Sequence, residues 1–212
     1  MQMVDFLFRW LHLIFGVVWI GLLYYFNFVQ GEYFKQASSE ALADVKQKLV
    51  PRALAWFRWA SVLTFASGLL LFGGLVHAHL FNDFIILGAV IGFLMFLNVW
   101  LIIWPQQKIV LGLVSGDAAA AAAKAALASR TNTLFSMPVL FCMLGSPHLG
   151  YQSGHLLAAQ GGGLGLYLAL LLVVLLEFNA WFGKLGPLAS IRGVIHMSLA
   201  LAAALYCLVL FL

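Results

Sequence analysis

Charged residues are scarce in this sequence. Only 8% of its 212 residues are Asp, Glu, Lys or Arg, whereas 64% are hydrophobic. Because a soluble domain carries about 25% charged residues, this chain lacks the polar surface that a water-exposed globule needs, and we predict an integral membrane protein embedded in a lipid bilayer. The net charge of +4 is spread over several segments. Without a dense basic patch, we expect no nucleic-acid partner.

Cysteines are also few, and no Cys-x-x-Cys-His motif is present. This chain is therefore expected to attach no c-type haem. Cys142 and Cys207 both lie in apolar runs, where a thiol acts as a small hydrophobic group. No basic segment precedes the first apolar run, so a cleavable signal peptide is not expected. Long unbroken apolar runs, rather than short alternating ones, predict an all-α membrane protein and not a barrel.

Six apolar segments predict one transmembrane helical domain over residues 1–212, a bundle of about six helices. A span needs about 20 apolar residues, or about 17 at the short end. The weakest segment, 131–145, is short, contains Pro138 and begins with polar residues. We expect it either to extend back into the alanine-rich run before it or to follow a short interfacial helix there. The expected spans are about 6–29, 53–75, 84–104, 131–145, 163–181 and 193–212.

The basic residues indicate an orientation. Ten of the eleven Lys and Arg residues lie in or just beyond the segments 30–52, 105–130 and 182–192, and the intervening segments 76–83 and 146–162 contain none. The positive-inside rule places such basic segments in the cytoplasm. We therefore predict a multi-pass protein of the bacterial inner membrane with both termini on the outer, periplasmic side. Within 30–52, a capping serine and a helical pattern predict a short amphipathic surface helix, with a solvated linker as the alternative.

The first span contains a histidine and an arginine on one helical face. Arg9, His12 and Gly16 are spaced three and four residues apart, which places them side by side. An imidazole beside a glycine suits a b-type haem: the histidine binds the iron and the glycine leaves room for the macrocycle. Arg9 is then a partner for a haem propionate. The alternative is a histidine that hydrogen-bonds to another helix, with Arg9 reaching the lipid headgroups.

Other histidines lie in the segments predicted to be outside. His77, His79 and His148 are candidates for the second haem ligand because they share a side with His12. Together with His155 they are also candidates for a separate metal site, although loop histidines are commonly just solvated. His196 is expected near the inner face, at the depth of Glu177, where the pair predicts either a proton or quinone site or a network that fixes helix packing.

Several stretches together resemble one family. The segments "RWLHLIFGVVWIG" (9–21), "LAWFRWASVLTFASGLLL" (54–71), "NVWLIIWPQQK" (98–108) and "ALASRTNTLFSMPVLFCMLGSPH" (126–148) are similar to the urate oxidase N-terminal domain, the membrane part of PuuD-type urate hydroxylases. The resemblance covers about 8–28 and 51–148, and Glu177 and His196 fall on it less clearly. Positions on the shared pattern are Arg9, His12, Trp56, Trp59, Asn98, Trp104, Pro105, Gln107, Ser129, Arg130, Asn132, Ser136 and Pro138.

The resemblance implies a membrane redox domain, fused in full-length members to a C-terminal c-type cytochrome. This chain is expected to lack that cytochrome and to pass electrons to a separate cytochrome or quinone. Urate is an anionic purine, so its site should contain a cation beside amide donors and acceptors. Arg130 with Asn132, or Arg52 with Arg58, can serve as that site, and the alternative for both pairs is an anchor at the inner membrane face. Glu177 is a further catalytic candidate. A second hypothesis remains open: an accessory subunit, without catalytic activity, that packs against a larger respiratory or oxygenase complex in the membrane.

Overall fold

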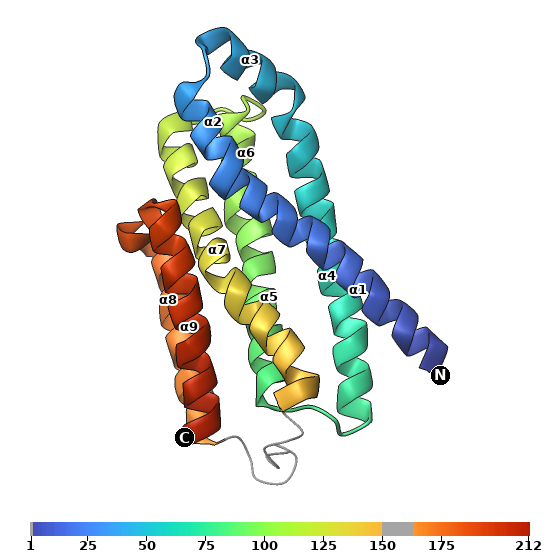
Figure 1. Ribbon diagram of the computed structural model, residues 1–212. Coiled ribbons are helices and arrows are strands. Elements are labelled where there is room, and N and C mark those ends of the chain that lie inside the picture. Colours follow the sequence, from blue (N-terminus) through green and yellow to red (C-terminus); the bar gives the residue numbers. More distant parts are fainter. Residues whose placement is uncertain (1, 150–162) are drawn as a thin grey trace.

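The protein is a bundle of helices. The computed structural model describes residues 2–149 and 163–212, and within these ranges it contains no β-strand (Figure 1). Two of its long rods are each built from consecutive elements, with a π-helical stretch between two α-helices: α1 (Gln2–Tyr24), η1 (Tyr25–Gln30) and α2 (Gly31–Gln36), and later α5 (Asp83–Leu97), η2 (Asn98–Ile103) and α6 (Trp104–Val110). The other long helices are α4 (Val50–His77), α7 (Ala118–Leu149), α8 (Leu164–Phe182) and α9 (Ile191–Phe211), and the connections include the short α3 (Ser39–Lys48) and the 3₁₀ turn η4 (Gly186–Ala189).

Five helical segments of the described residues are long and apolar enough to cross a membrane: Met3–Gln36, Ser39–His77, Asp83–Val110, Leu164–Phe182 and Ile191–Phe211. Both termini lie at the end of the bundle opposite α2, α3 and α6 (Figure 1). This arrangement has the alternation that the basic segments predict. The side of the membrane on which each end lies stays a prediction, as does the bacterial inner membrane.

The segment expected to be the weakest span is part of α7, the central helix of the bundle. α7 extends back through the alanine-rich run, as one of the two alternatives predicts. It packs against α5, α6, α8 and α9 and also touches α1. Its polar side chains Thr131, Asn132, Thr133 and Ser136 are all buried. A helix surrounded by protein needs less apolar surface than one that faces lipid, which explains the low hydropathy of this segment.

Pro138 lies inside α7 without breaking it. Proline has no N–H, so the carbonyl of Leu134, four residues earlier, loses its helical partner. The hydroxyl of Ser198 on α9 donates a hydrogen bond to this carbonyl at 2.7 Å. A backbone group inside an apolar bundle must find its hydrogen bond within the protein. Ser198 therefore replaces the hydrogen bond that Pro138 cannot donate, and it links α9 to α7.

The amphipathic helix predicted within 30–52 is confirmed as α3. The Ser38 hydroxyl accepts a hydrogen bond from the Ala41 N–H at 3.3 Å and so caps its first turn. Lys48 pairs with Asp44 one turn earlier. None of the residues of α3 is buried, as a surface helix requires.

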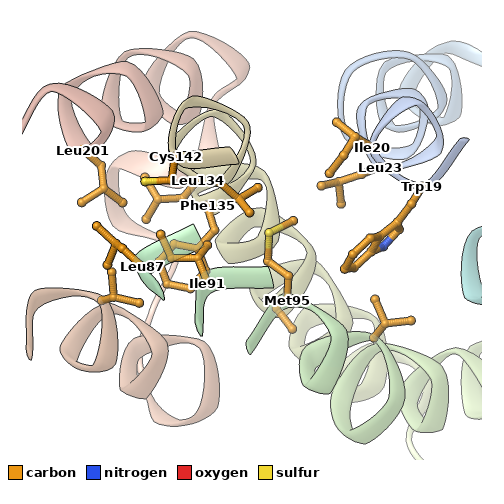
Figure 2. Close-up of a cluster of buried hydrophobic side chains, with 14 of the residues drawn as sticks. Trp19, Ile20, Leu23, Leu87, Ile91, Met95, Leu134, Phe135, Cys142 and Leu201 are labelled. Atoms are coloured by element: carbon orange, nitrogen blue, oxygen red, sulfur yellow. The ribbon is translucent and has the colours of Figure 1, made fainter. Parts of the chain in front are cut away.

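The apolar core joins helices that are far apart in the sequence. Figure 2 shows Trp19 and Leu23 of α1, Ile91 and Met95 of α5, and Phe135 of α7 among its members. Leu201 of α9 belongs to the same cluster. The core therefore fixes α7 between α1, α5 and α9 and determines which faces of these helices meet.

Replacing Gly165 with alanine should destabilise the contact between α8 and α9. A Cβ atom at this position would overlap the carbonyl oxygen of Leu208 in α9, and small residues are what allow such close approach of helices. Overpacking of this kind costs about 1–3 kcal/mol, so the unfolding temperature in detergent should fall by several degrees. Gly73→Ala in α4 is the matched control, because nothing lies within 4 Å of its added Cβ. Equal unfolding temperatures for the two variants would contradict the close contact at Gly165.

Candidate functional site

A buried polar network connects α5, α7 and α8. The amide nitrogen Nδ2 of Asn98 donates to Oδ1 of Asn132 at 2.9 Å and to Oε2 of Glu177 at 3.0 Å. The indole Nε1 of Trp181 donates to the other carboxylate oxygen, Oε1, at 2.9 Å. Asn132 in turn donates from Nδ2 to the backbone carbonyl of Met95 at 2.9 Å. We call Asn98, Asn132, Glu177 and Trp181 the Glu177 network.

The backbone of α5 sets the direction of every bond in this network. The Met95 carbonyl can only accept, so the Asn132 amide must present its nitrogen to Met95 and its oxygen to Asn98. Asn98 then uses both hydrogens of its Nδ2 group, one toward Asn132 and one toward Glu177. Trp181 is a donor only. The carboxylate of Glu177 is therefore held by two neutral donors, from Asn98 and Trp181.

Local structure brings these side chains together. Glu177 and Trp181 are one turn apart on α8, which aligns them on one face. Asn98 is the first residue of the π-helical stretch η2, and such stretches frequently occur at functional sites. Asn132 lies in the buried polar run of α7. The sequence indicates Asn98, Asn132 and Glu177 separately, but it does not show that they meet or that Trp181 joins them.

The network carries unsatisfied groups, which is unusual inside a helical bundle. Glu177 is only 8% exposed, and the ion pairs of the described residues do not include it. Oδ1 of Asn98 is buried and has no hydrogen-bond partner among residues 2–149 and 163–212. A buried carboxyl without a cation and a buried oxygen without a donor are both costly. Ionisable groups placed this way in membrane helices are functional candidates.

A cavity adjoins the carboxyl group. It has a volume of about 270 Å³, and Glu177 and Trp181 line one part of it. Leu94 of α5 and Val174 of α8 line another part. Of the Glu177 network, Glu177 and Trp181 therefore line a mainly apolar recess between α5 and α8, whereas Asn98 and Asn132 do not.

Arg130 lies on α7 near a second set of polar contacts. Asn27 of η1 donates from Nδ2 to the Ser129 hydroxyl at 2.8 Å, which brings η1 against this part of α7. Arg130 Nη1 and Gln30 Oε1 are both buried and have no hydrogen-bond partner in the described ranges. Successive residues of a helix are about 100° apart, so Arg130 points away from the face on which Asn132 reaches the Glu177 network.

His12 contacts α4. Its Nδ1 lies 2.9 Å from the carbonyl oxygen of Thr64 and 3.1 Å from the hydroxyl of Ser67. Because a carbonyl only accepts, Nδ1 carries the proton and the neutral ring keeps a lone pair on Nε2. The ring also lies against Gly68, where an added Cβ would be 3.0 Å from Cε1. This is the fixed tautomer that a metal-binding imidazole uses, and it is equally the helix-to-helix hydrogen bond of the alternative interpretation.

The other residues proposed for a haem do not gather around His12. Arg9 pairs with Asp5 on its own helix at 2.7 Å, and both side chains are exposed. Gly16 faces the methyl group of Thr64 at 4.0 Å from an ideal Cβ position. His77 ends α4, nine residues beyond Gly68, which is about 13 Å along the helix axis.

The remaining histidines lie at helix ends. His79, with a φ of 56°, and His148 are both exposed, and His155 lies outside the described residues. Within the described part of the chain, no three His, Cys, Asp or Glu side chains come close enough to hold a metal ion. The second haem ligand therefore stays a prediction, and so does haem binding itself.

His196 is not a member of the Glu177 network. Its side chain is exposed, and Nδ1 bonds to the carbonyl of Arg192 on its own helix at 2.8 Å. The expected pairing of His196 with Glu177 is wrong, because depth along two helices does not determine which faces meet. Trp181, which the sequence does not single out, contacts the Glu177 carboxylate instead. The spacing of four residues between Glu177 and Trp181 places both on one face of a helix, and this is the sequence feature that could have indicated their contact.

Comparison with known families adds one match. A family model described as urate oxidase N-terminal matches residues 75–184. Neither a search of curated proteins nor a search of solved structures found a match. The matched range contains all four residues of the Glu177 network, whereas His12 lies outside it. The Glu177 network is therefore the strongest candidate site in the part of the chain that the family model covers.

Proposed function

The chain belongs to the urate oxidase N-terminal family, and we propose that it works as a urate-hydroxylase-like redox domain in a bacterial inner membrane. The match agrees with the family that the sequence motifs indicate. The observation that carries the proposal is the Glu177 network, a buried carboxyl held by neutral donors within the matched range. The proposed enzyme class needs a group of this kind, because its reaction releases protons.

The proposed reaction is a two-electron oxidation. Urate takes a hydroxyl group from water, and two protons and two electrons leave: urate + H₂O gives a hydroxylated product + 2 H⁺ + 2 e⁻. Glu177 exchanges protons, because its carboxylate oxygens keep lone pairs beyond those that accept from Asn98 and Trp181. The electrons pass to a separate acceptor, a cytochrome or a quinone, held in or beside the membrane.

Arg130 is the proposed cation for the anionic purine. Its buried Nη1 has no hydrogen-bond partner in the described residues, although the charge of Glu32 acts on it. Gln30, whose buried Oε1 also lacks a hydrogen bond, lies on η1, which contacts α7 through Asn27 and Ser129. A planar anion with N–H groups can satisfy both. Arg52, the alternative cation from the sequence, is exposed, and Arg58 lies over the ring of Trp104 at 3.3 Å. Both residues suit an anchor at the membrane surface better than a closed site.

A haem b would be held through Nε2 of His12. The fixed Nδ1 proton fits that role for one ligand, and the close packing of the ring on Gly68 fixes its position. A bound haem would supply one-electron transfer. In this role, Thr64 and Ser67 orient the imidazole of His12 through their contacts with Nδ1.

Urate-dependent electron transfer tests the proposal. The purified protein should consume urate and reduce ferricyanide in a ratio of two ferricyanide ions per urate, measured from the ultraviolet absorbance of urate and the visible absorbance of ferricyanide. Arg130→Gln should raise the KM for urate at least tenfold, because the charge is lost. Arg52→Gln, the same change at an exposed arginine, should leave KM unchanged. A wild-type protein that reduces no acceptor with urate would refute the function, and a KM effect at Arg52 alone would refute the role of Arg130.

A further inference from the structure

The cavity beside Glu177 differs from an ordinary packing gap in its lining. Its walls are Leu94, Val174, Glu177, Phe178, Trp181 and Phe182. Phe178 is 58% exposed and Phe182 is 81% exposed, so the mouth of the cavity is apolar and lies on the outer face of α8. Both α5 and α8 belong to segments apolar enough to cross a membrane. Molecules dissolved in the bilayer can therefore enter this cavity without passing through water.

The polar end of the cavity is suited to a ring that carries oxygen atoms. Each oxygen of Glu177 accepts one hydrogen bond, from Trp181 or from Asn98, and a carboxylate has about four acceptor positions in total. Two positions therefore remain for hydroxyl donors of a ligand. When Glu177 is protonated, its own hydroxyl can donate to a ligand carbonyl.

We propose that this cavity binds the head group of a membrane quinone, which accepts the electrons of the reaction proposed above, and this inference rests on that proposed function. A quinone has carbonyl oxygens for the Glu177 end, a flat ring for the aromatic walls and an apolar tail for the mouth. The electron balance is quinone + 2 e⁻ + 2 H⁺ gives quinol, with the electrons taken from urate. Quinone reduction takes up as many protons as urate oxidation releases. Glu177 donates one proton to a quinone oxygen and is then reprotonated from the aqueous phase, which also supplies the second proton.

The arrangement of α7 separates this acceptor from the substrate. Asn132 reaches the Glu177 network from one face of α7, and Arg130, two residues earlier, lies about 200° around the helix. Urate at Arg130 and quinone at Glu177 are then on opposite sides of one helix. A lipid acyl chain is the competing occupant, but it has no group that can hydrogen-bond to the carboxyl.

Blocking the cavity from the lipid side tests the inference. Val174→Trp adds bulk at a wall residue that is 40% exposed and outside the Glu177 network. Leu175→Trp is the matched control, one residue along α8 and 58% exposed without lining the cavity. Binding of a radiolabelled short-chain ubiquinone to the purified protein, without urate, is measured by equilibrium dialysis in detergent.

We expect saturable binding to the wild type, at least tenfold weaker binding to Val174→Trp, and a change of less than twofold for Leu175→Trp. Unchanged binding in Val174→Trp, no saturable binding to the wild type, or equal displacement by phospholipid alone would overturn the proposal. Urate oxidation with ferricyanide should survive in Val174→Trp, because that acceptor does not need the cavity. Quinone binding without urate oxidation would refute the proposed function alone, and urate oxidation without quinone binding would refute this inference alone.

Discussion

Replacing Glu177 with glutamine is expected to lower urate-dependent reduction of a short-chain ubiquinone at least about 100-fold, since acid–base groups contribute about 10²–10⁴ to rates. Glutamine keeps the size of the side chain but cannot exchange the proton. The rate is measured at saturating urate, so that a change in substrate binding does not obscure the effect. Glu177→Asp keeps the carboxyl and should retain more activity than Glu177→Gln.

The glutamine variant also perturbs the network, and this effect has to be separated from catalysis. Asn98 Nδ2 and Trp181 Nε1 both donate to Glu177, and one of them would face the new amide nitrogen, another donor. A lost buried hydrogen bond costs about 1–3 kcal/mol, which a thermal unfolding curve detects. Glu40→Gln on the exposed surface of α3 is the matched control for the substitution itself. Full activity in folded Glu177→Gln would remove Glu177 from the mechanism.

The sequence predicts the architecture well because its signals are local. Alternating basic segments indicate helices that run in opposite directions, and Figure 1 has both termini at one end of the bundle. The serine cap predicts α3, and the alanine run predicts the extension of α7. Each of these features depends on residues that are only a few positions apart in the chain, so the sequence itself contains the information needed to predict it.

Contacts between helices are harder to predict from the same patterns. His196 and Glu177 share a depth, yet the rotation of α9 turns His196 outward while Asn98 and Trp181 reach the carboxyl. Low hydropathy around Asn132 resembles a weak span, but it results from burial by neighbouring helices. Rotation about a helix axis is determined by packing in the whole bundle, so the members of a buried site become clear only in the fold.

The second large effect concerns His12. If His12 binds haem b, the wild-type protein purified with haem available should show a Soret band and a reduced α-band, and His12→Ala should lose both. His196→Ala is the control, because this exposed histidine bonds only within α9 in the described structure. An absorption spectrum measures this without any activity.

Both interpretations of His12 share the hydrogen bonds of Nδ1 to α4 and differ only at Nε2. A packing histidine needs nothing there, whereas a ligand directs that lone pair to iron. Ser67→Ala removes one Nδ1 contact and leaves the Thr64 carbonyl in place, so a haem protein should keep its bands with a small shift. If the wild type shows no bands, or if His12→Ala keeps them, the haem assignment fails. His12 is then a side chain that ties α1 to α4, and removing its contacts to Thr64 and Ser67 should lower stability by about 1–3 kcal/mol without changing the spectrum.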